Sequence, residues 1–212
     1  MDRLDIELRV IEEKEQIIDS FTKKGYEVSW FDSAKAAAEY LNQKIDGKTV
    51  GFGDSETFRQ MDLYEKFSVY NKIADPIHCP EEKFNEVAKE ALDTEVFLTS
   101  VNAASIQGEL VNIDGTGNRV AGSLFGHDEM YFVFGINKFA PDLTSAVKRA
   151  REVAAPINAK RWNLKTPCVA DGKCHDCSSP DRICNDLLIH FHAPTSTSMK
   201  CKVIIIEENL GF

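Results

Sequence analysis

The stretch KTVGFGDSETFRQMDLYEKF, residues 48–67, holds the pattern that decides the fold. Its first part, KTVGFG (48–53), is typical of a β-strand. Its second part, SETFRQMDLYEKF (55–67), is typical of a helix that begins near Ser55. A strand that runs through a glycine turn into a helix is the repeating unit of α/β proteins, so this stretch indicates an α/β fold.

The same alternation continues on both sides of this unit. On the N-terminal side, the sequence predicts a helix over 2–24, a strand over 26–31 and a helix over 34–45. On the C-terminal side, it predicts a short strand over 68–72, a helix over 81–92 and a strand over 95–100. Repeated strand–helix alternation favours a largely parallel sheet with flanking helices.

The second half of the chain has a different texture. Between Gly108 and Gly135, short β-like runs separated by glycines predict an antiparallel excursion made of ELVNID, NRVAG and MYFVFGI. A further helix is expected from Asp142 to about Val153, ended by Pro156, and two last strands are expected over LLIHFH and KCKVIIIEE. We expect one domain over residues 1–212, with residues 166–185 as a cysteine-rich insert within it.

Composition and charge exclude several classes of protein. The net charge is −9 and the acidic residues are spread along the chain, whereas a nucleic-acid surface needs clustered Lys and Arg. No apolar run reaches the roughly 20 residues of a membrane span, and the start, MDRLDIELRV, lacks the apolar core of a signal peptide. We therefore expect a cytoplasmic protein that binds neither nucleic acid nor membrane.

The loop GFGDSET (51–57) is the first candidate ligand site. Backbone N–H groups at a helix start attract anions, glycine lets the backbone approach a ligand, and hydroxyl groups add hydrogen bonds. These properties make Gly53, Asp54, Ser55 and Thr57 candidate ligand-binding residues. The alternative is an ordinary helix cap after a glycine turn, and the loop is not a Walker loop because no G-K-[ST] follows.

Polar residues also crowd the run from Ser100 to Gly122. Alternate residues on a predicted strand share one face, and an arginine beside amides and a carboxylate can hold a carboxylate or phosphate ligand. The candidate ligand-binding residues in this run are Asn102, Asn112, Asp114, Asn118 and Arg119. A hairpin with ordinary turn residues is the alternative, since Asp-Gly and Gly-Asn favour turns in any case.

Asn137 and Lys138 follow the predicted strand MYFVFG and form a third candidate ligand site. Ligands of α/β proteins gather beyond the carboxyl ends of parallel strands. If each of the three polar loops follows such a strand, the loops meet in one pocket where Lys138 supplies positive charge. The alternative is a solvated lysine in a surface loop.

Four of the six cysteines lie in TPCVADGKCHDCSSPDRIC (166–184). Cytosolic thiols are kept reduced, so clustered cysteines indicate metal binding or redox chemistry rather than disulfides. The candidate metal ligands are Cys168, Cys174, Cys177 and Cys184. Four thiolates suit an iron–sulfur cluster or a tetrahedral zinc ion, and a single C-x-x-C pair favours the cluster; four free thiols are the remaining alternative.

Three runs of the chain resemble the LUD domain family, the proteins related to lactate-utilisation protein C: NAASIQGELVNIDGTGNRVAG, GINKFAPDLTSAVKRAREVAAPINAKR and TPCVADGKCHDCSSPDRICN. The likeness extends from about Asp5 to IIIEENLGF and is greatest to single-domain members with a cysteine-bearing C-terminal segment. The resemblance implies a sheet like that of ribose-5-phosphate isomerase, glucosamine-6-phosphate deaminase and the CoA transferases. It also implies association with L-lactate oxidation to pyruvate, beside partner proteins that carry iron–sulfur clusters.

These observations leave three functions open. The preferred one is a redox accessory protein, in which the four cysteines hold a cluster, with 4Fe–4S favoured, and Arg119 or Lys138 fixes a small carboxylate such as lactate. The second is a non-redox enzyme for a phosphorylated or CoA-linked molecule, with Asp114 as general base and a structural metal. The third is a ligand-binding regulatory module. The sequence leaves open the natural substrate, the metal, the redox partner, the oligomeric state and whether the protein is catalytic.

Overall fold

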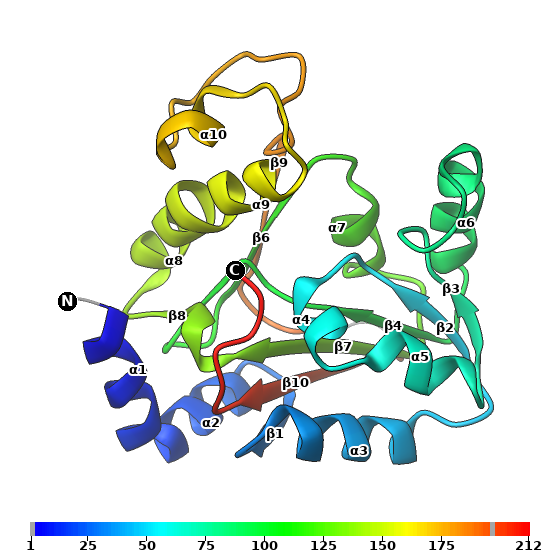
Figure 1. Cartoon of the computed structure of the whole chain (residues 1–212). Coiled ribbons are helices and arrows are strands. Elements are labelled where there is room, and N and C mark those ends of the chain that lie inside the picture. The colour runs from blue at the N-terminus through cyan, green and yellow to red at the C-terminus, as the bar shows by residue number, and fades with distance from the viewer. Residues whose placement is uncertain (1–2, 196–197) are drawn as a thin grey trace.

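The computed structural model describes residues 3–195 and 198–212, which form two sheets with surrounding helices (Figure 1). The larger sheet has six strands in the order β1-β10-β7-β4-β2-β3, and every neighbouring pair runs parallel. Its strands are β1 (Glu27–Phe31), β2 (Thr49–Phe52), β3 (Lys72–Ala74), β4 (Val96–Thr99), β7 (Glu129–Gly135) and β10 (Lys200–Ile206). The predicted α/β fold with a parallel sheet is confirmed.

The smaller sheet is mixed and has four strands in the order β8-β5-β6-β9. Its strands are β5 (Ala103–Ser105), β6 (Leu110–Asp114), β8 (Phe139–Ala140) and β9 (Asp186–His190). Strand β6 pairs antiparallel with β5 and β9, whereas β5 pairs parallel with β8. The antiparallel excursion expected after Gly108 is therefore present at β6.

Short helices make up most of the remaining structure. They are α1 (Arg3–Glu12), α2 (Lys14–Lys23), α3 (Ala34–Lys44), α4 (Glu56–Gln60), α5 (Leu63–Ser68), α6 (Phe84–Ala91), α7 (Asn118–Gly122), α8 (Leu143–Arg149), α9 (Ala155–Arg161) and α10 (Pro167–Asp171). Across the described part of the chain, no helix has the length and apolar character needed to cross a membrane.

The larger sheet is buried on both faces. Phe132 and Phe134 of β7 belong to the core cluster that includes side chains of α1 and α2. Tyr131 and Val133 of the same strand belong to the cluster on the other face, with side chains of α3 and α5. Because successive strand residues point to opposite faces, burial of both faces explains why MYFVFG is almost continuously apolar.

Two runs of the predicted meander have other structures. NRVAG (118–122) is helix α7 rather than a strand, because the Asp114 side chain accepts hydrogen bonds from the N–H groups of Arg119 and Val120 and so starts a helical turn. MYFVFG is β7, which lies between β4 and β10 in the parallel sheet. Its apolar side chains pack into the core on both faces of the sheet, and the strand does not pair in a hairpin.

Other boundaries also differ from those expected, and the helix expected over 55–67 is two helices, α4 and α5. The helix that Pro156 was expected to end continues through the π-helical segment Ala150–Ala154 into α9, with Pro156 in its first turn, where proline is tolerated. The strand expected over 68–72 is β3, which begins only at the last of those residues. The helix expected over 2–24 is two helices, α1 and α2, and residue 2 lies outside the described residues.

Candidate functional site

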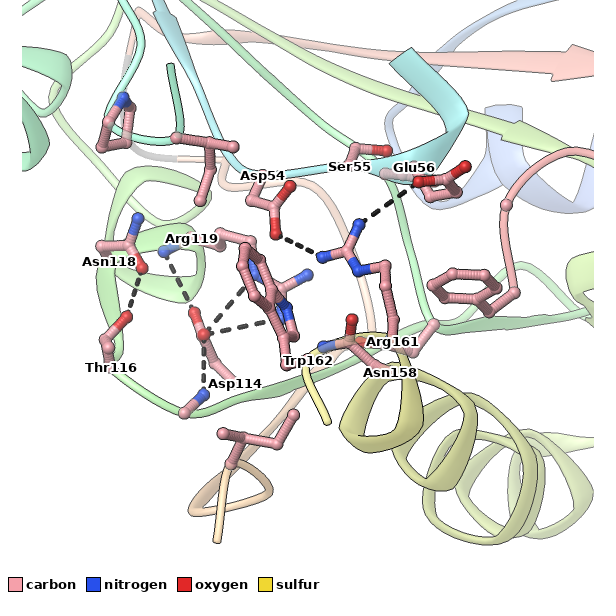
Figure 2. Close-up of a pocket in the computed structure, with 18 of the residues that line it drawn as sticks. Asp54, Ser55, Glu56, Asp114, Thr116, Asn118, Arg119, Asn158, Arg161 and Trp162 are labelled. Atoms are coloured by element: carbon pink, nitrogen blue, oxygen red, sulfur yellow. Dashed lines mark hydrogen bonds and ion pairs between the residues drawn. The ribbon is translucent and has the colours of Figure 1, made fainter. Parts of the chain in front are cut away.

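A cavity of about 510 Å³ lies beyond the carboxyl ends of β2, β4 and β7. Its wall is formed by the loops after β2, β4 and β6, by Lys138 and by α9 (Figure 2). The predicted ligand-binding residues that line this large cavity are Asp54, Ser55, Thr57, Asn102, Asp114, Asn118, Arg119 and Lys138. The polar loops expected to converge therefore do meet in one place.

Gly53 does not line the large cavity but makes room for a residue that does. A Cβ atom at this position would lie 2.7 Å from Thr99 Oγ1 and 3.1 Å from Arg119 Cγ. Both distances are too short for an ordinary contact, so any larger residue here would push the Arg119 side chain away. Gly53 therefore allows two chain segments to approach each other closely.

Ser55 stands at the N-cap position of α4, yet its side chain caps nothing. The Ser55 Oγ atom is buried and has no hydrogen-bond partner among the described residues. Thr57 Oγ1 lies 3.2 Å from Ser100 Oγ in the same wall. A buried hydroxyl without a partner is costly, so Ser55 is available to a ligand.

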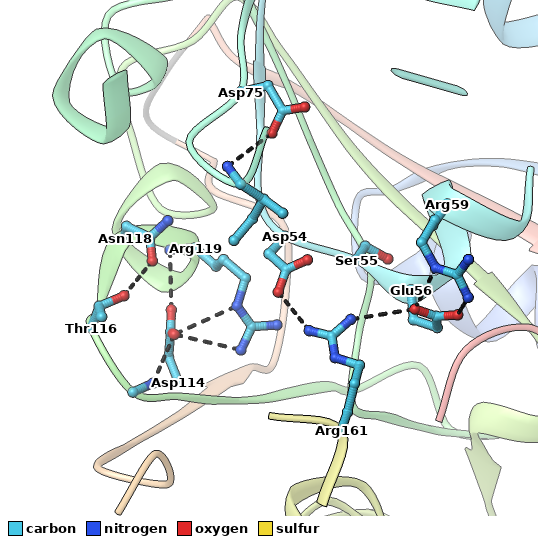
Figure 3. Close-up of polar contacts among 12 residues, drawn as sticks. Asp54, Ser55, Glu56, Arg59, Asp75, Asp114, Thr116, Asn118, Arg119 and Arg161 are labelled. Atoms are coloured by element: carbon cyan, nitrogen blue, oxygen red, sulfur yellow. Dashed lines mark hydrogen bonds and ion pairs between the residues drawn. The ribbon is translucent and has the colours of Figure 1, made fainter. Parts of the chain in front are cut away.

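Asp114 is engaged by its own loop. Its Oδ2 accepts backbone hydrogen bonds from Arg119 at 3.0 Å and Val120 at 3.1 Å, and its Oδ1 accepts one from Gly115 at 2.8 Å. The Arg119 Nε atom lies 3.5 Å from Asp114 Oδ1 (Figure 3). A carboxylate occupied in this way holds the loop and α7 in place, which does not support the role of general base considered for it.

The side chains of Asn102 and Asn112 each accept a backbone hydrogen bond from the other's chain segment. The backbone N–H of Asn102 donates to Asn112 Oδ1 at 3.2 Å, and the N–H of Ile113 donates to Asn102 Oδ1 at 2.8 Å. Asn112 is buried and lies outside the large cavity. The asparagines that recur in this run therefore fix the pairing of β5 with β6, and only Asn102 also reaches the cavity.

Lys138 is a deeply buried amine in the wall of the large cavity, since only 3% of the residue is exposed. Burial, followed by the positive charge of Arg149, lowers the pKa of Lys138 well below its ordinary value. The Lys138 Nζ atom donates a hydrogen bond to the main-chain oxygen of Phe212. The lysine is thus a wall residue of the cavity rather than the solvated lysine that was the alternative.

Asn137 lies outside the large cavity and holds the C-terminal residues. Its Oδ1 accepts a hydrogen bond from the N–H of Leu210 at 3.1 Å, and its Nδ2 donates to the carbonyl of Gly211 at 3.5 Å. A ligand-binding role for Asn137 stays a prediction. Its contacts show that it positions the segment that lies across the cavity.

Arg161, at the end of α9, lines the large cavity and is a candidate site residue that the sequence did not reveal. Its Nη2 lies 2.8 Å from Asp54 Oδ2 and its Nη1 lies 3.3 Å from Glu56 Oε2 (Figure 3). Its guanidinium also stacks at 4.9 Å from the ring centre of Trp162. The signal was present as a basic residue in a helical pattern, but Pro156 was taken as the end of that helix.

A second cavity of similar size, about 600 Å³, adjoins the large cavity at this ion pair. Residues that line both are Asp54, Ser55, Glu56, Ile77, Arg161, Trp162 and Phe212. Hydrogen bonding from Arg59, and then the charges of Arg59 and Arg161, outweigh burial and lower the pKa of Glu56. The boundary between the two cavities is therefore a network of opposite charges.

The four cysteines of the C-terminal segment share one small cavity of about 20 Å³ against α9. All four, Cys168, Cys174, Cys177 and Cys184, are free thiols. Burial raises the pKa of Cys184; the positive charge of Arg182 opposes this rise, and nearby Cys174 and Cys177 add to it. The sequence prediction that these four residues come together is supported by their common cavity.

The four thiols share a cavity but are not placed as a ready-made site for one metal ion. No three His, Cys, Asp or Glu side chains in residues 3–195 and 198–212 are placed to hold a single metal ion. A zinc ion draws its sulfur ligands to about 2.3 Å from one centre. A four-iron cluster binds each thiolate to a different iron and keeps the sulfurs farther apart. Residues 173–179 are irregular, so they can adjust to either group.

Helix α9 separates the large cavity from the cysteine cavity. Asn158 and Arg161 of this helix, with Trp162 just after it, lie in the wall of the large cavity. Its residues in the wall of the cysteine cavity are Ala155, Pro156 and Ala159. Ile183 lines both cavities. The cysteine segment lies on the far side of α8 and α9 from the larger sheet, so two chemically different sites flank one helix (Figure 1).

A parallel sheet with a polar cavity at its carboxyl edge defines an α/β domain with a ligand-sized site. The chain matches the LUD domain over residues 14–206 and belongs to the LUD domain family. The crystal structure of a DUF162 family protein from Deinococcus radiodurans is similar, with a TM-score of 0.52 and 13% identity, over 97% of this chain and 99% of that chain. At this identity the likeness shows a shared fold alone. No curated protein matches the chain in sequence.

Proposed function

We propose that the protein is a cytoplasmic accessory protein of lactate utilisation. The large cavity binds a small carboxylate such as L-lactate, and Cys168, Cys174, Cys177 and Cys184 hold a 4Fe–4S cluster that passes electrons to iron–sulfur partner proteins. Membership of the LUD domain family supports the link to lactate. The observation that carries the proposal is that the cavity and the cysteines lie on two sides of the same helix, α9.

The lining of the large cavity suits a small hydroxy acid. Arg119, Lys138 and Arg161 supply positive charge for a carboxylate. The unpartnered Ser55 hydroxyl supplies a hydrogen bond for a second polar group, such as the hydroxyl of lactate. Arg161 already pairs with Asp54 and Glu56, so it has carboxylate-binding geometry that a ligand can use by exchange.

The width of α9 suits electron transfer between the two sites. A helix with its side chains is about 10 Å across, so a ligand in the large cavity lies roughly one helix diameter from the four thiols. Oxidation of L-lactate to pyruvate releases two electrons and two protons. A cluster at the cysteines carries one electron at a time, so it passes the first to an iron–sulfur partner protein before it takes the second, and the two protons pass to water. Ile183, shared by both walls, keeps the short path between them apolar.

Iron and acid-labile sulfide contents, with an absorption spectrum, test the cluster on protein purified without oxygen. We expect a brown protein with roughly four iron and four sulfide per chain. The Cys177→Ser variant is expected to lose both. Cys79→Ser is the matched control, because Cys79 is a free thiol outside the cysteine segment, and it is expected to keep the cluster. Zinc in place of iron, or a Cys177→Ser variant identical to the wild type, would contradict the proposal.

The size of the cavities favours a second candidate function. Lactate is small, whereas the large cavity of about 510 Å³ and its neighbour of about 600 Å³ are of the size that holds drug-sized ligands. We therefore also consider a non-redox enzyme or a regulatory module for a phosphorylated or CoA-linked molecule, with zinc as a structural metal. A sheet related to ribose-5-phosphate isomerase and the CoA transferases, which the resemblance implies, agrees with this candidate.

Thermal unfolding with added ligands separates the two candidates. The first predicts that L-lactate raises the unfolding temperature and that ribose 5-phosphate and CoA do not. The second predicts the reverse, together with zinc in the purified protein. The Arg161→Gln variant is expected to weaken the effect of whichever ligand binds, since it removes one cation from the boundary of both cavities.

A further inference from the structure

The C-terminal residues of the sequence reach the cationic end of the large cavity. Gly211 and Phe212 line this cavity. The main-chain oxygen of Phe212 accepts a hydrogen bond from Lys138 Nζ, and Arg149 Nη1 donates to the same oxygen at 3.3 Å. One oxygen atom therefore receives hydrogen bonds from two cationic side chains.

In the described part of the chain, these two cations hydrogen-bond to main-chain oxygens rather than to Asp or Glu side chains. Arg149 donates to the main-chain oxygens of Asn137, Asn102 and Phe212. Across residues 3–195 and 198–212, neither Lys138 nor Arg149 forms an ion pair with an Asp or Glu side chain. Lys138 is buried and Arg149 is half-buried, so the two cations repel each other and lose hydration, a cost that a bound anion would relieve.

We propose that Lys138 and Arg149 form a subsite for the carboxylate of a small organic acid, and that Gly211–Phe212 is an internal occupant that the ligand displaces. This inference rests on the proposed function and deepens it, because it names the two residues that bind the carboxylate. Arg149 is not part of the cavity wall but meets Lys138 at the Phe212 oxygen, whereas the cations Arg119 and Arg161 of the wall are already paired with Asp114 and with Asp54. An incoming carboxylate gains charge-assisted hydrogen bonds from two donors at the subsite.

The tail is held in a way that allows displacement. Leu210 is buried and anchors the segment to the core. Beyond it, the N–H of Gly211 donates to Gln60 Oε1 at 2.8 Å, on the exposed side. The Phe212 ring lies 5.6 Å from the Arg161 guanidinium carbon. The contacts that hold Gly211 and Phe212 are separate from the packing of Leu210, so a ligand can break them while Leu210 stays in the core.

Gly211 offers a substitution that expels the tail without changing either cation. Its φ angle of +62° is in the left-handed region that favours glycine. An added Cβ atom would lie 2.8 Å from Thr57 Oγ1 and 3.1 Å from Lys138 Nζ. Gly211→Ala is therefore expected to free the subsite. Gln60→Ala removes one bond to the tail from the outside and is a milder second variant.

Isothermal titration calorimetry at constant ionic strength tests the subsite with acetate, L-lactate and the uncharged acetamide. We expect acetate and L-lactate to bind Gly211→Ala about tenfold more tightly than the wild type, and Gln60→Ala more tightly by a smaller factor. Lys138→Met, which replaces the cation by an apolar side chain, is expected to weaken both by about tenfold or more. Acetamide binding is expected to be equal in all variants.

Several results would overturn the inference. Weaker acetate binding by Gly211→Ala would mean that the tail completes the site rather than occupying it. Unchanged binding by Lys138→Met, or no acetate binding by any variant, would show that these cations are not a carboxylate subsite. If acetate follows the expected pattern and L-lactate binds no better than acetate, the subsite stands and lactate is removed from the proposed function. Iron content tests the cluster independently of all these outcomes.

Discussion

Among the individual side chains, most charges around the large cavity are neutralised within the protein. Arg119 pairs with Asp114, and Arg161 pairs with Asp54. Lys138 is different, because it is buried beside another cation and its hydrogen bond is to a main-chain oxygen. These two kinds of charge have opposite consequences for stability, and each can be measured separately.

Asp114→Ala is expected to destabilise the protein by about 2 kcal/mol, because three backbone N–H groups lose a charged acceptor. Urea unfolding followed by circular dichroism measures this change. Asp186→Ala is the control, because Asp186 is exposed at the start of β9, and it is expected to change the free energy of unfolding by less than about 0.5 kcal/mol. Equal effects of the two substitutions would show that Asp114 does not hold the loop.

Lys138→Met is expected to stabilise the ligand-free protein, by about 1 kcal/mol, because it removes a buried charge that repels Arg149. The control is Lys24→Met. Lys24 Nζ lies 2.7 Å from the buried Glu109 carboxylate, so its removal leaves a charge without its partner and is expected to destabilise. Thermal unfolding of both variants tests this difference in sign. A loss of stability in Lys138→Met would indicate a structural lysine.

The sequence could predict which polar loops meet, because loops after parallel strands share one edge of the sheet. It could not assign a role to each polar residue in them. Asn137 looks like a ligand-binding residue, yet it bonds to Leu210, which is 73 positions away in the chain. Gly53 likewise matters because it leaves room for the Arg119 side chain. Such roles depend on which distant segment packs there, and local pattern carries no information about that.

Among the helices and strands, helix ends proved harder to predict than helix starts. Ser33 directly precedes the helix expected over 34–45, and its Oγ accepts a hydrogen bond from the N–H of Ala36 at 3.2 Å. Asp142 was expected to begin a helix, and its Oδ1 accepts one from Ser145 at 2.7 Å. Caps are local interactions and are visible in sequence. The continuation past Pro156 depends on a π-helical segment that no local rule predicts.

The buried His190, at the end of strand β9, contacts Ser123 just after helix α7, and its burial predicts a pH effect. His190 Nε2 lies 3.1 Å from Ser123 Oγ, and burial lowers the pKa of His190 to about 4. In the unfolded chain the pKa of histidine is about 6.5. The histidine therefore leaves stability intact above pH 6.5 and removes it progressively as the pH falls towards 4, because only the unfolded chain takes up the proton there.

Between pH 6.5 and pH 4 we expect this one group to cost about 3 kcal/mol of unfolding free energy. His190→Gln is therefore expected to lose less stability across this range than the wild type, whereas His192→Gln, at an exposed position, is expected to match the wild type. Urea unfolding at a series of pH values measures the slopes. Identical slopes for His190→Gln and the wild type would show that His190 titrates normally in the folded protein.

In the molecule as a whole, the parallel sheet could be predicted from strand–helix alternation, but its strand order could not. The last strand, β10, lies between β1 and β7, so segments from both ends of the chain and its middle lie side by side (Figure 1). This arrangement places the cysteine segment on one side of α9 and the polar loops on the other side. The closeness of the two sites is a result of tertiary packing, and the sequence alone shows only that both exist.

Coupling between the two sides of α9 is best tested by a potentiometric titration of protein purified without oxygen, with and without saturating L-lactate. We predict a reducible iron–sulfur centre whose potential falls by roughly a few tens of millivolts when lactate binds, because an anion about one helix diameter away disfavours an added electron. The Cys177→Ser variant is expected to show no such centre. A potential that is the same with and without lactate, or no reducible centre in the wild type, would contradict the proposed link between the cavity and the cysteines.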